Sequence, residues 1–331
     1  MDLDRRTFLR AGLSLTGVGL LAGCQLVPPL GRPPARLRRV GFLTSDAFQA
    51  PELEAFRQEL RDLGYVEGQT LAVESRVAPD DASLPRLVQE LIQLPVDVIV
   101  TGAASASLAA KKATDTIPIV IAMTDDPVGS GLVASLSRPG GNVTGLASYS
   151  GALLPKRLEL LKDIVPGLAR VGILWTAAAP SHTNSVRQAE DASRALGIEA
   201  VALELRDGEL ESAFEQAARE QVQALMTTPG PIFGRERARL ADLALQHRQP
   251  MVANFRTAVV YGALISYGAD YTELFRRAAA YVDKIFRGKS PADLPVEQPT
   301  KFELVINLKT AQALDLSIPP SLLAQATQVL Q

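Results

Sequence analysis

The chain has 331 residues and a formal net charge of -2; 47% of its residues are hydrophobic and 21% are charged. A chain of this length is expected to fold as about two compact units, and 34 Lys and Arg against 36 Asp and Glu argue against a nucleic-acid-binding surface. The single cysteine excludes a disulfide within the chain, and with two histidines no metal site is expected.

The first 23 residues have the features of an export signal. An arginine pair at positions 5 and 6 precedes an uncharged stretch over 11–23, which is too short to cross a bilayer. The stretch runs into the sequence LAGC, so that Cys24 follows two small residues. This pattern resembles a twin-arginine signal joined to a lipoprotein processing box, in which Cys24 becomes the lipidated N-terminus. A buried N-terminal helix with an ordinary core cysteine is the less favoured alternative.

Residues 24–37 are predicted to form a stiff tether. Proline pairs at 28–29 and 33–34 cannot join a sheet or the interior of a helix, and arginines lie between and after them. These arginines either rest on anionic lipid headgroups or are solvated charges of an ordinary linker.

From Val40 onward, short apolar runs alternate with helical patterns, which is typical of βαβ units and a parallel sheet. Helix 52–63, for example, places Leu53, Phe56, Leu60 and Leu63 on one face. Strands are expected at 40–43, 71–77, 96–100 and 118–122, and helices at 52–63, 84–94 and 104–113.

The second half of the chain repeats the order of the first. RVGFL at 39–43 matches RVGIL at 170–174, and PIV at 118–120 matches PMV at 250–252. A further match, LG at 63–64 with LG at 196–197, has nearly the same offset. A near-constant offset in the same element order predicts an α/β fold of two similar, doubly wound parallel-sheet lobes.

Two such lobes predict a ligand cleft between them. In open parallel sheets, ligands lie outside the carboxyl ends of the strands and against helix N-termini. Hydroxyl side chains follow the predicted strands at Ser45, Thr101, Thr176 and Thr228. Each alone is most simply a helix N-cap, but the set from both lobes favours a small polar ligand.

Patterns typical of enzymes are mostly missing. GSG at 129–131 lacks the third glycine of a dinucleotide fingerprint, and there is neither a phosphate-binding loop nor a Gly-x-Ser-x-Gly elbow. His182 and His247 are interpreted as surface or capping residues. Asp125 and Asp126 could perform acid–base chemistry if burial separated their pKa values. An N-cap that also contacts a ligand amine is the favoured interpretation.

Long motifs resemble those of a known family. DPVGSGLV at 126–133 and RPGGNVTG at 138–145 are similar to bacterial ABC-transporter substrate-binding proteins, which include tryptophan- and tyrosine-type binders. PVEQPTKFELVINLKTA at 295–311 and IPPSLL at 318–323 strengthen the resemblance, which covers 38–331. It implies a type I periplasmic-binding fold with a hinge, no catalysis and no cofactor. It also implies delivery of a ligand to a permease and its ATPase.

The resemblance also implies how the chain is divided. One lobe is expected to comprise 38–145 with 268–296, and the other 146–267 with 297–331. The turn PGGN at 139–142, the segment 266–268 and the segment 295–300 are the expected crossings. The lobes would close because a ligand touches both of them only when the hinge is shut.

Candidate ligand residues come from both lines of reasoning. Asp126 and the helix start at 101–105 match family positions that face the cleft, and Tyr267 and Asp270 lie at a crossing. Thr176 stands where relatives often carry Asn, which leaves the identity of the ligand open, and Trp175 is assigned to the core rather than to the cleft wall. The predicted ligand set is Ser45, Thr101, Ser105, Asp126, Thr176, Asn184, Thr228, Tyr267 and Asp270.

These features predict a monomeric, lipid-anchored solute-binding protein at the extracytoplasmic face of a membrane, or in the periplasm. Its expected ligand is an amino acid or a related carboxylate. A sensor for a signalling partner and an enzyme that uses Asp125 and Asp126 are the alternatives. A cytoplasmic sugar-type repressor shares the fold, but it would need an N-terminal DNA-binding helix pair where this chain has an export signal.

Overall fold

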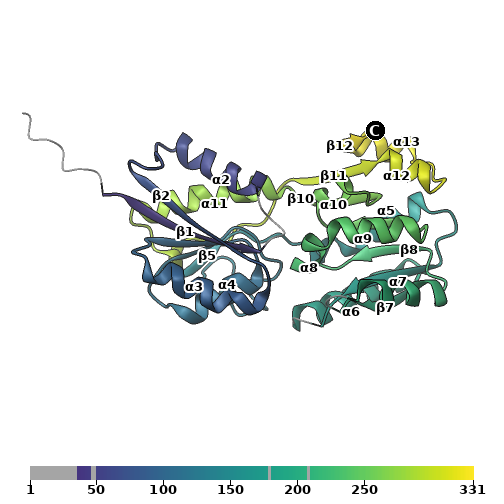
Figure 1. Ribbon diagram of the computed structural model, residues 1–331, viewed down its shortest axis with the longest axis horizontal. Helices are drawn as coiled ribbons and strands as arrows, with labels where there is room; N and C mark the ends of the chain where they lie inside the picture. The colour runs from purple at the N-terminus through teal and green to yellow at the C-terminus, as the bar shows by residue number, and fades with distance from the viewer. Residues whose placement is uncertain (1–35, 46–49, 178–179, 207–208) are drawn as a thin grey trace, which may run out of the picture. The chain divides into compact units, whose positions relative to one another are not determined.

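The computed structural model describes residues 36–45, 50–177, 180–206 and 209–331 (Figure 1). The chain divides into Met1–Leu37 and Arg38–Gln331, and the helices and strands below belong to the second unit. The predicted signal peptide, Cys24 and nearly all of the tether lie outside the described residues. Within the described part of the chain, no helix is both long and apolar enough to span a membrane.

The first sheet has five parallel strands in the order β2-β1-β3-β4-β5. These strands are β1 (Arg38–Ser45), β2 (Leu71–Ala78), β3 (Val98–Thr101), β4 (Ile119–Ile121) and β5 (Val143–Gly145). The helices that connect them are α2 (Ala50–Asp62), α3 (Leu84–Gln93) and α4 (Ala104–Ala113). All residues of β3 and β4 are buried, as expected for central strands covered on both faces.

The second sheet has seven strands in the order β12-β11-β10-β9-β8-β6-β7, and only the β10–β11 pair is antiparallel. Its strands are β6 (Arg170–Trp175), β7 (Glu199–Glu204), β8 (Ala224–Thr227), β9 (Met251–Ala253), β10 (Ile265–Ala269), β11 (Phe302–Asn307) and β12 (Gln328–Leu330). The helices of this half are α5 (Leu154–Ile164), α6 (Pro180–Ala195), α7 (Leu210–Arg219), α8 (Pro231–Arg235), α9 (Arg237–Gln246), α10 (Arg256–Val260), α12 (Leu308–Ala313) and α13 (Pro320–Gln325).

The predicted repeat is confirmed by the order of the strands. The first sheet has the order β2-β1-β3-β4-β5. From its β7 edge, the second sheet begins β7-β6-β8-β9-β10, so its first five strands in chain order have the same relative arrangement. The second sheet then continues through β11 and β12, which have no counterpart in the first. The fold is therefore α/β, with two parallel-dominated sheets of similar build.

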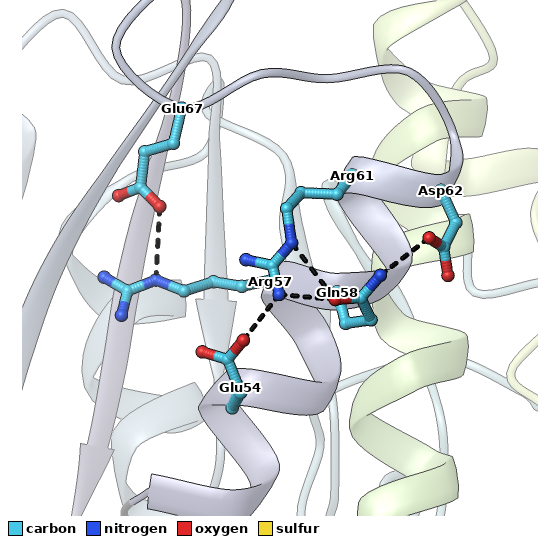
Figure 2. A network of polar contacts seen from close by, with 6 residues as sticks. All are labelled: Glu54, Arg57, Gln58, Arg61, Asp62 and Glu67. Carbon is cyan, nitrogen blue, oxygen red and sulfur yellow. Dashed lines mark hydrogen bonds and ion pairs between the residues drawn. The ribbon is translucent and has the colours of Figure 1, made fainter.

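Helix α2 shows how the sequence divides an element between core and solvent. Phe56 and Leu60, on its inner face, are fully buried. Its outer face carries a network of polar contacts, in which Arg61 pairs with Glu54 and Arg57 pairs with Glu67 (Figure 2). Such exposed pairs contribute little to stability, so burial of the apolar face is what holds α2 in place.

Helix α11 (Tyr271–Phe286) follows a strand of the second sheet but packs against the first. It lies beside α2 (Figure 1), and the ring of its Phe275 is 5.9 Å from that of Phe42 on β1. The Arg38 guanidinium also donates a hydrogen bond of 3.0 Å to the carbonyl of Phe286. The chain therefore returns to the first sheet after it has built five strands of the second.

The segments in which the chain runs from one sheet to the other are called passages here. The first passage begins where the backbone at Gly145 lies close to that of Ile121. The turn at 139–142, expected to be a crossing, instead leads into β5, and the chain leaves the first sheet after Gly145. Gly145 has a φ of 133°, and a Cβ there would lie 2.0 Å from the carbonyl oxygen of Ile121. The next residue, Leu146, forms a parallel bridge with Glu297, which lies on the last passage. Strand β10 stays paired with β11 through Ala269, past the expected boundary at 267.

Candidate functional site

Buried polar side chains gather at the carboxyl ends of the strands in both sheets. In the first sheet, β1, β3 and β4 end at or near Thr44, Thr101 and Thr124. In the second, β8 and β9 are followed by Thr228 and Asn254, each at most 2% exposed. Buried polar groups at this edge are unusual unless they are hydrogen-bonded or meet a ligand.

Two predicted ligand residues are already hydrogen-bonded inside the fold. The hydroxyl of Thr101 is 2.7 Å from that of Ser107 on α4, and the hydroxyl of Thr228 donates to the carbonyl of Leu174 at 3.0 Å. Both side chains are completely buried. In this conformation they hold strand ends and the start of a helix in register, rather than presenting a free donor.

Three other predicted residues have hydrogen bonds within the fold, and two of them cap a turn or a helix. The Ser105 hydroxyl donates to Oδ1 of Asp81 at 3.1 Å. Oδ1 of Asp126 accepts from the backbone N–H of Gly129 at 2.7 Å, and Asp126 is exposed. Oδ1 of Asp270 accepts from the N–H of Glu273 at 3.0 Å, which caps α11. These contacts leave the second carboxylate oxygen of each aspartate as a further acceptor.

The remaining predicted residues lie in different settings. Tyr267 is half-buried on β10, with its ring 6.1 Å from that of Phe302. Thr176 is half-buried just after β6, whereas Asn184 is exposed on α6. Ser45 ends β1, but its side chain lies outside the described residues.

A buried network joins the end of β4 to the first passage between the sheets. Oδ1 of Asp125 accepts a hydrogen bond of 2.5 Å from the hydroxyl of Ser148 and one of 3.0 Å from the N–H of Ser150. Arg157 on α5 then donates from Nη1 to the carbonyl of Ser150 at 3.1 Å and from Nη2 to its hydroxyl at 2.8 Å. The same guanidinium donates from Nε to the carbonyl of Tyr267 at 2.7 Å.

Burial shifts the pKa values of ionisable groups in and beside this network. Loss of solvent lowers the pKa of Arg157 to about 10, although Tyr271 and Asp125 favour the charged form. Arg157 therefore remains protonated at neutral pH. Burial, together with the nearby charge of Asp125, raises the pKa of the Tyr271 hydroxyl.

Comparison with known proteins decides the family. A sequence model described as ABC transporter substrate binding protein matches residues 41–330. The chain belongs to this family. The resemblance noted in the motifs is thereby confirmed, and the ABC transporter substrate-binding family accounts for the two repeated sheets.

Relatives of this substrate-binding protein support the same fold. The tyrosine-binding protein of Clostridioides difficile (strain R20291) is 26% identical over 264 residues, which cover 80% of this chain and 76% of that protein. The crystal structure of a conserved domain protein from Vibrio cholerae is 28% identical, with a TM-score of 0.81, and covers 89% of this chain and 100% of that one.

A second structure is that of an ABC domain in complex with L-Trp from Streptococcus pneumonia. It is 23% identical, with a TM-score of 0.82, and it too covers 89% of this chain and 100% of that one. At this identity the likeness concerns the fold alone.

A small pocket of the substrate-binding protein lies beside the start of α11. Its lining residues come from α2, the start of α10, the end of β10, the start of α11 and the start of β11: Glu52, Phe255, Arg256, Thr257, Ala269, Tyr271, Thr272 and Glu303. Burial raises the pKa of Glu52, and its own backbone N–H, Arg256 and Arg237 offset this only in part. Burial also raises the pKa of Glu303, with a further contribution from Asp270.

Sequence reasoning missed Arg157, although a signal was present. Leu154, Leu158 and Leu161 form the apolar face of α5, and Arg157 falls on that same face by its spacing. A charged residue within an apolar helical stripe must have buried partners, because an unpaired buried charge is very costly. The pattern predicts a buried polar network but cannot name Ser150 and Tyr267 as its acceptors.

Proposed function

We propose that this protein binds an amino acid or a related carboxylate outside the cytoplasm and delivers it to an ABC permease and its ATPase. The observation that carries the proposal is the set of polar side chains at the carboxyl ends of strands in two repeated sheets. It is supported by membership of a substrate-binding family and by relatives described as binding tyrosine and L-Trp.

The start of α4 is a suitable receptor for the ligand carboxylate. The helix begins directly after β3, and its first N–H groups have no partner within the helix, so they attract an anion. At Gly102 a Cβ would lie 2.7 Å from the Thr44 hydroxyl oxygen and 3.1 Å from Cζ of Phe275. The backbone can be this close to β1 and α11 only because residue 102 has no side chain.

The ligand ammonium requires an acceptor, and Asp126 is the favoured one. Its carboxylate is exposed, and one of its oxygens caps the turn to Gly129. Trp175 offers a further polar contact: it is half-buried at the end of β6, and its indole N–H has no hydrogen-bond partner among the described residues. Trp175 also packs partly against the second core, so it contributes to the core and can still donate to a ligand.

We propose binding without catalysis. Asp125 accepts from Ser148 and Ser150, and Asp126 accepts from Gly129, so each aspartate has a structural role in this fold. This supports a binding protein over an enzyme that uses the pair. In this proposal the units that close on the ligand are the predicted lobes, 38–145 with 268–296 and 146–267 with 297–331.

A thermal-shift screen of the twenty amino acids and common carboxylates tests the ligand class. A ligand at a hundred times its Kd adds about 2.7 kcal/mol to the free energy of unfolding, which raises Tm by several degrees. We expect such a shift with at least one amino acid. If no amino acid and no carboxylate raises Tm, the proposed ligand class is wrong.

The proposed membrane attachment has a separate test. We propose that residues 1–23 are removed, that Cys24 is lipidated, and that 24–37 tether a monomer to the membrane. Metabolic labelling with palmitate should mark the wild-type protein, and Cys24→Ser should abolish the label and release the protein from the membrane fraction. Equal labelling of both proteins would contradict this assignment.

A further inference from the structure

One side chain holds the first passage between the sheets, 146–150, against β10, the strand from which the second passage leaves. Arg157 lies on α5 and is completely buried. Its guanidinium contacts Ser150 on the first passage and the carbonyl of Tyr267 on β10, 110 residues after Arg157 in the chain. All three of these hydrogen bonds come from a planar group whose donors keep a constant spacing.

The backbone around these passages has little freedom to adjust. At Gly268 a Cβ would lie 2.6 Å from the carbonyl oxygen of Asn254 and 3.7 Å from Nη2 of Arg157. Tyr149, next to Ser150, has a φ of 57°, which is unusual for an aromatic residue. Strained backbone of this kind persists only where its surroundings hold it in place.

The network also reaches the first sheet. Asp125 follows β4 and accepts from Ser148 and Ser150, the same segment that Arg157 holds from the other side. Ser150 therefore lies between an anion contributed by the first half and a cation contributed by the second. A rotation about 146–150 that moved Ser150 away from Asp125 or Arg157 would break these hydrogen bonds.

We propose that Arg157 is a positioning residue that fixes the first passage relative to β10, from which the second passage leaves, and thereby limits how far the sheets can move relative to each other. The proposal rests on the binding function proposed above, because it assigns a role in ligand-dependent closure to the fork of Arg157, which is the set of three hydrogen bonds that its guanidinium donates. Arg157 itself is not assigned a contact with the ligand.

Distance measurements between spin labels test this without any ligand. The chain has one cysteine, so Cys24→Ser removes the native thiol, and Lys112→Cys on α4 and Ala218→Cys on α7 place labels at exposed positions of the two halves. In the ligand-free protein we expect Arg157→Met to broaden the distance distribution by several ångströms. Arg157→Lys keeps the charge but loses the fork, and we expect an intermediate broadening.

Matched controls separate positioning from stability. Lys156→Met changes the neighbouring residue, whose side chain is 43% exposed, and should leave the distribution unchanged. Leu161→Ala opens a cavity on the buried face of the same helix and should lower Tm without broadening the distribution. If Arg157→Met fails to fold, Ser150→Ala removes one acceptor of the fork and should broaden the distribution on its own.

The outcomes are decisive whether or not the ligand class is correct. An unchanged distribution in folded Arg157→Lys and Ser150→Ala would overturn the positioning role, and so would equal broadening in Leu161→Ala. Failure of the thermal-shift screen would leave this ligand-free measurement intact, so the two proposals can fail separately.

Discussion

The hydroxyl of Tyr65 donates a hydrogen bond of 2.9 Å to Oδ1 of Asp283, 218 residues further along the chain. Tyr65 follows α2 in the first half, whereas Asp283 belongs to α11, which follows β10 of the second sheet. Arg287 donates to the same oxygen of Asp283 at 2.9 Å. This contact therefore fastens a late helix to an early part of the chain.

Removal of that hydroxyl should weaken the attachment of α11. We expect Tyr65→Phe to lower the free energy of unfolding by about 1 kcal/mol, because one partly buried hydrogen bond to a charged acceptor is lost while the ring remains packed on Phe286. Urea denaturation measures this difference. Tyr261→Phe, which removes a hydroxyl from a residue that is 48% exposed, is the control and should have little effect.

The close approach at Gly145 predicts a large effect of a single methyl group. We expect Gly145→Ala to lower the free energy of unfolding by about 2–4 kcal/mol, because its Cβ would overlap the backbone of Ile121 and φ is positive. Gly141→Ala is the matched control, since a Cβ there meets nothing within 4 Å. Equal stability of the two variants would show that the chain passes from β5 to Leu146 differently from the structure.

The buried carboxyl group of Glu52 should make the free energy of unfolding depend on pH, and burial determines the direction of this dependence. Its pKa is raised above the ordinary value of 4.5, so between 4.5 and the raised value the folded state binds more protons than the unfolded state. Stability therefore falls as pH rises through this window, and the cost of the buried charge persists above it. Glu52→Gln should remove this dependence, so that the variant gains stability relative to wild type as pH rises.

Urea titrations at several pH values from 4 upward measure that difference. Glu54→Gln is the control: it lies on the same helix, but its side chain is 61% exposed, and its curve should run parallel to that of wild type. A constant offset between Glu52→Gln and wild type at every pH would contradict the assigned cause.

Asp126→Asn tests the proposed ammonium contact. Asparagine keeps an oxygen that can accept from the N–H of Gly129, so the turn should survive, but the negative charge is lost. We expect affinity for an amino acid to fall about tenfold, which corresponds to about 1.4 kcal/mol. Isothermal titration with the ligand found in the screen measures this change. Asp115→Asn, another exposed aspartate, should bind as wild type does.

Much of the fold was predictable because local patterns agree with the tertiary structure. The helix expected at 104–113 has the bounds of α4, since Ala103 before it is extended and Thr114 after it is extended again. The strand expected from Val96 begins at Val98 instead, because Asp97 caps the N–H of Arg39 and its neighbours form a turn. Such end effects depend on partners that are distant in sequence.

The candidate site was less predictable for the same physical reason. Hydroxyls after strands were readily found, but the sequence does not show that Thr101 is bonded to Ser107 or Thr228 to Leu174. The role of Arg157 depends on two carbonyl groups, and backbone carbonyls leave no trace in side-chain patterns. Only the three-dimensional packing of α5 against the first passage and β10 identifies it.

The return of α11 to the first sheet has a consequence for the order in which the protein can fold during synthesis. The ring of Phe42 packs against both Phe56 and Phe275, so the first apolar core lacks one wall until the ribosome has made residue 275. By then the residues of β6 to β10 have already been synthesised. The half of the chain that is translated first therefore cannot finish folding first, and a nascent chain stalled after β5 should expose Phe42 to chaperones or proteases.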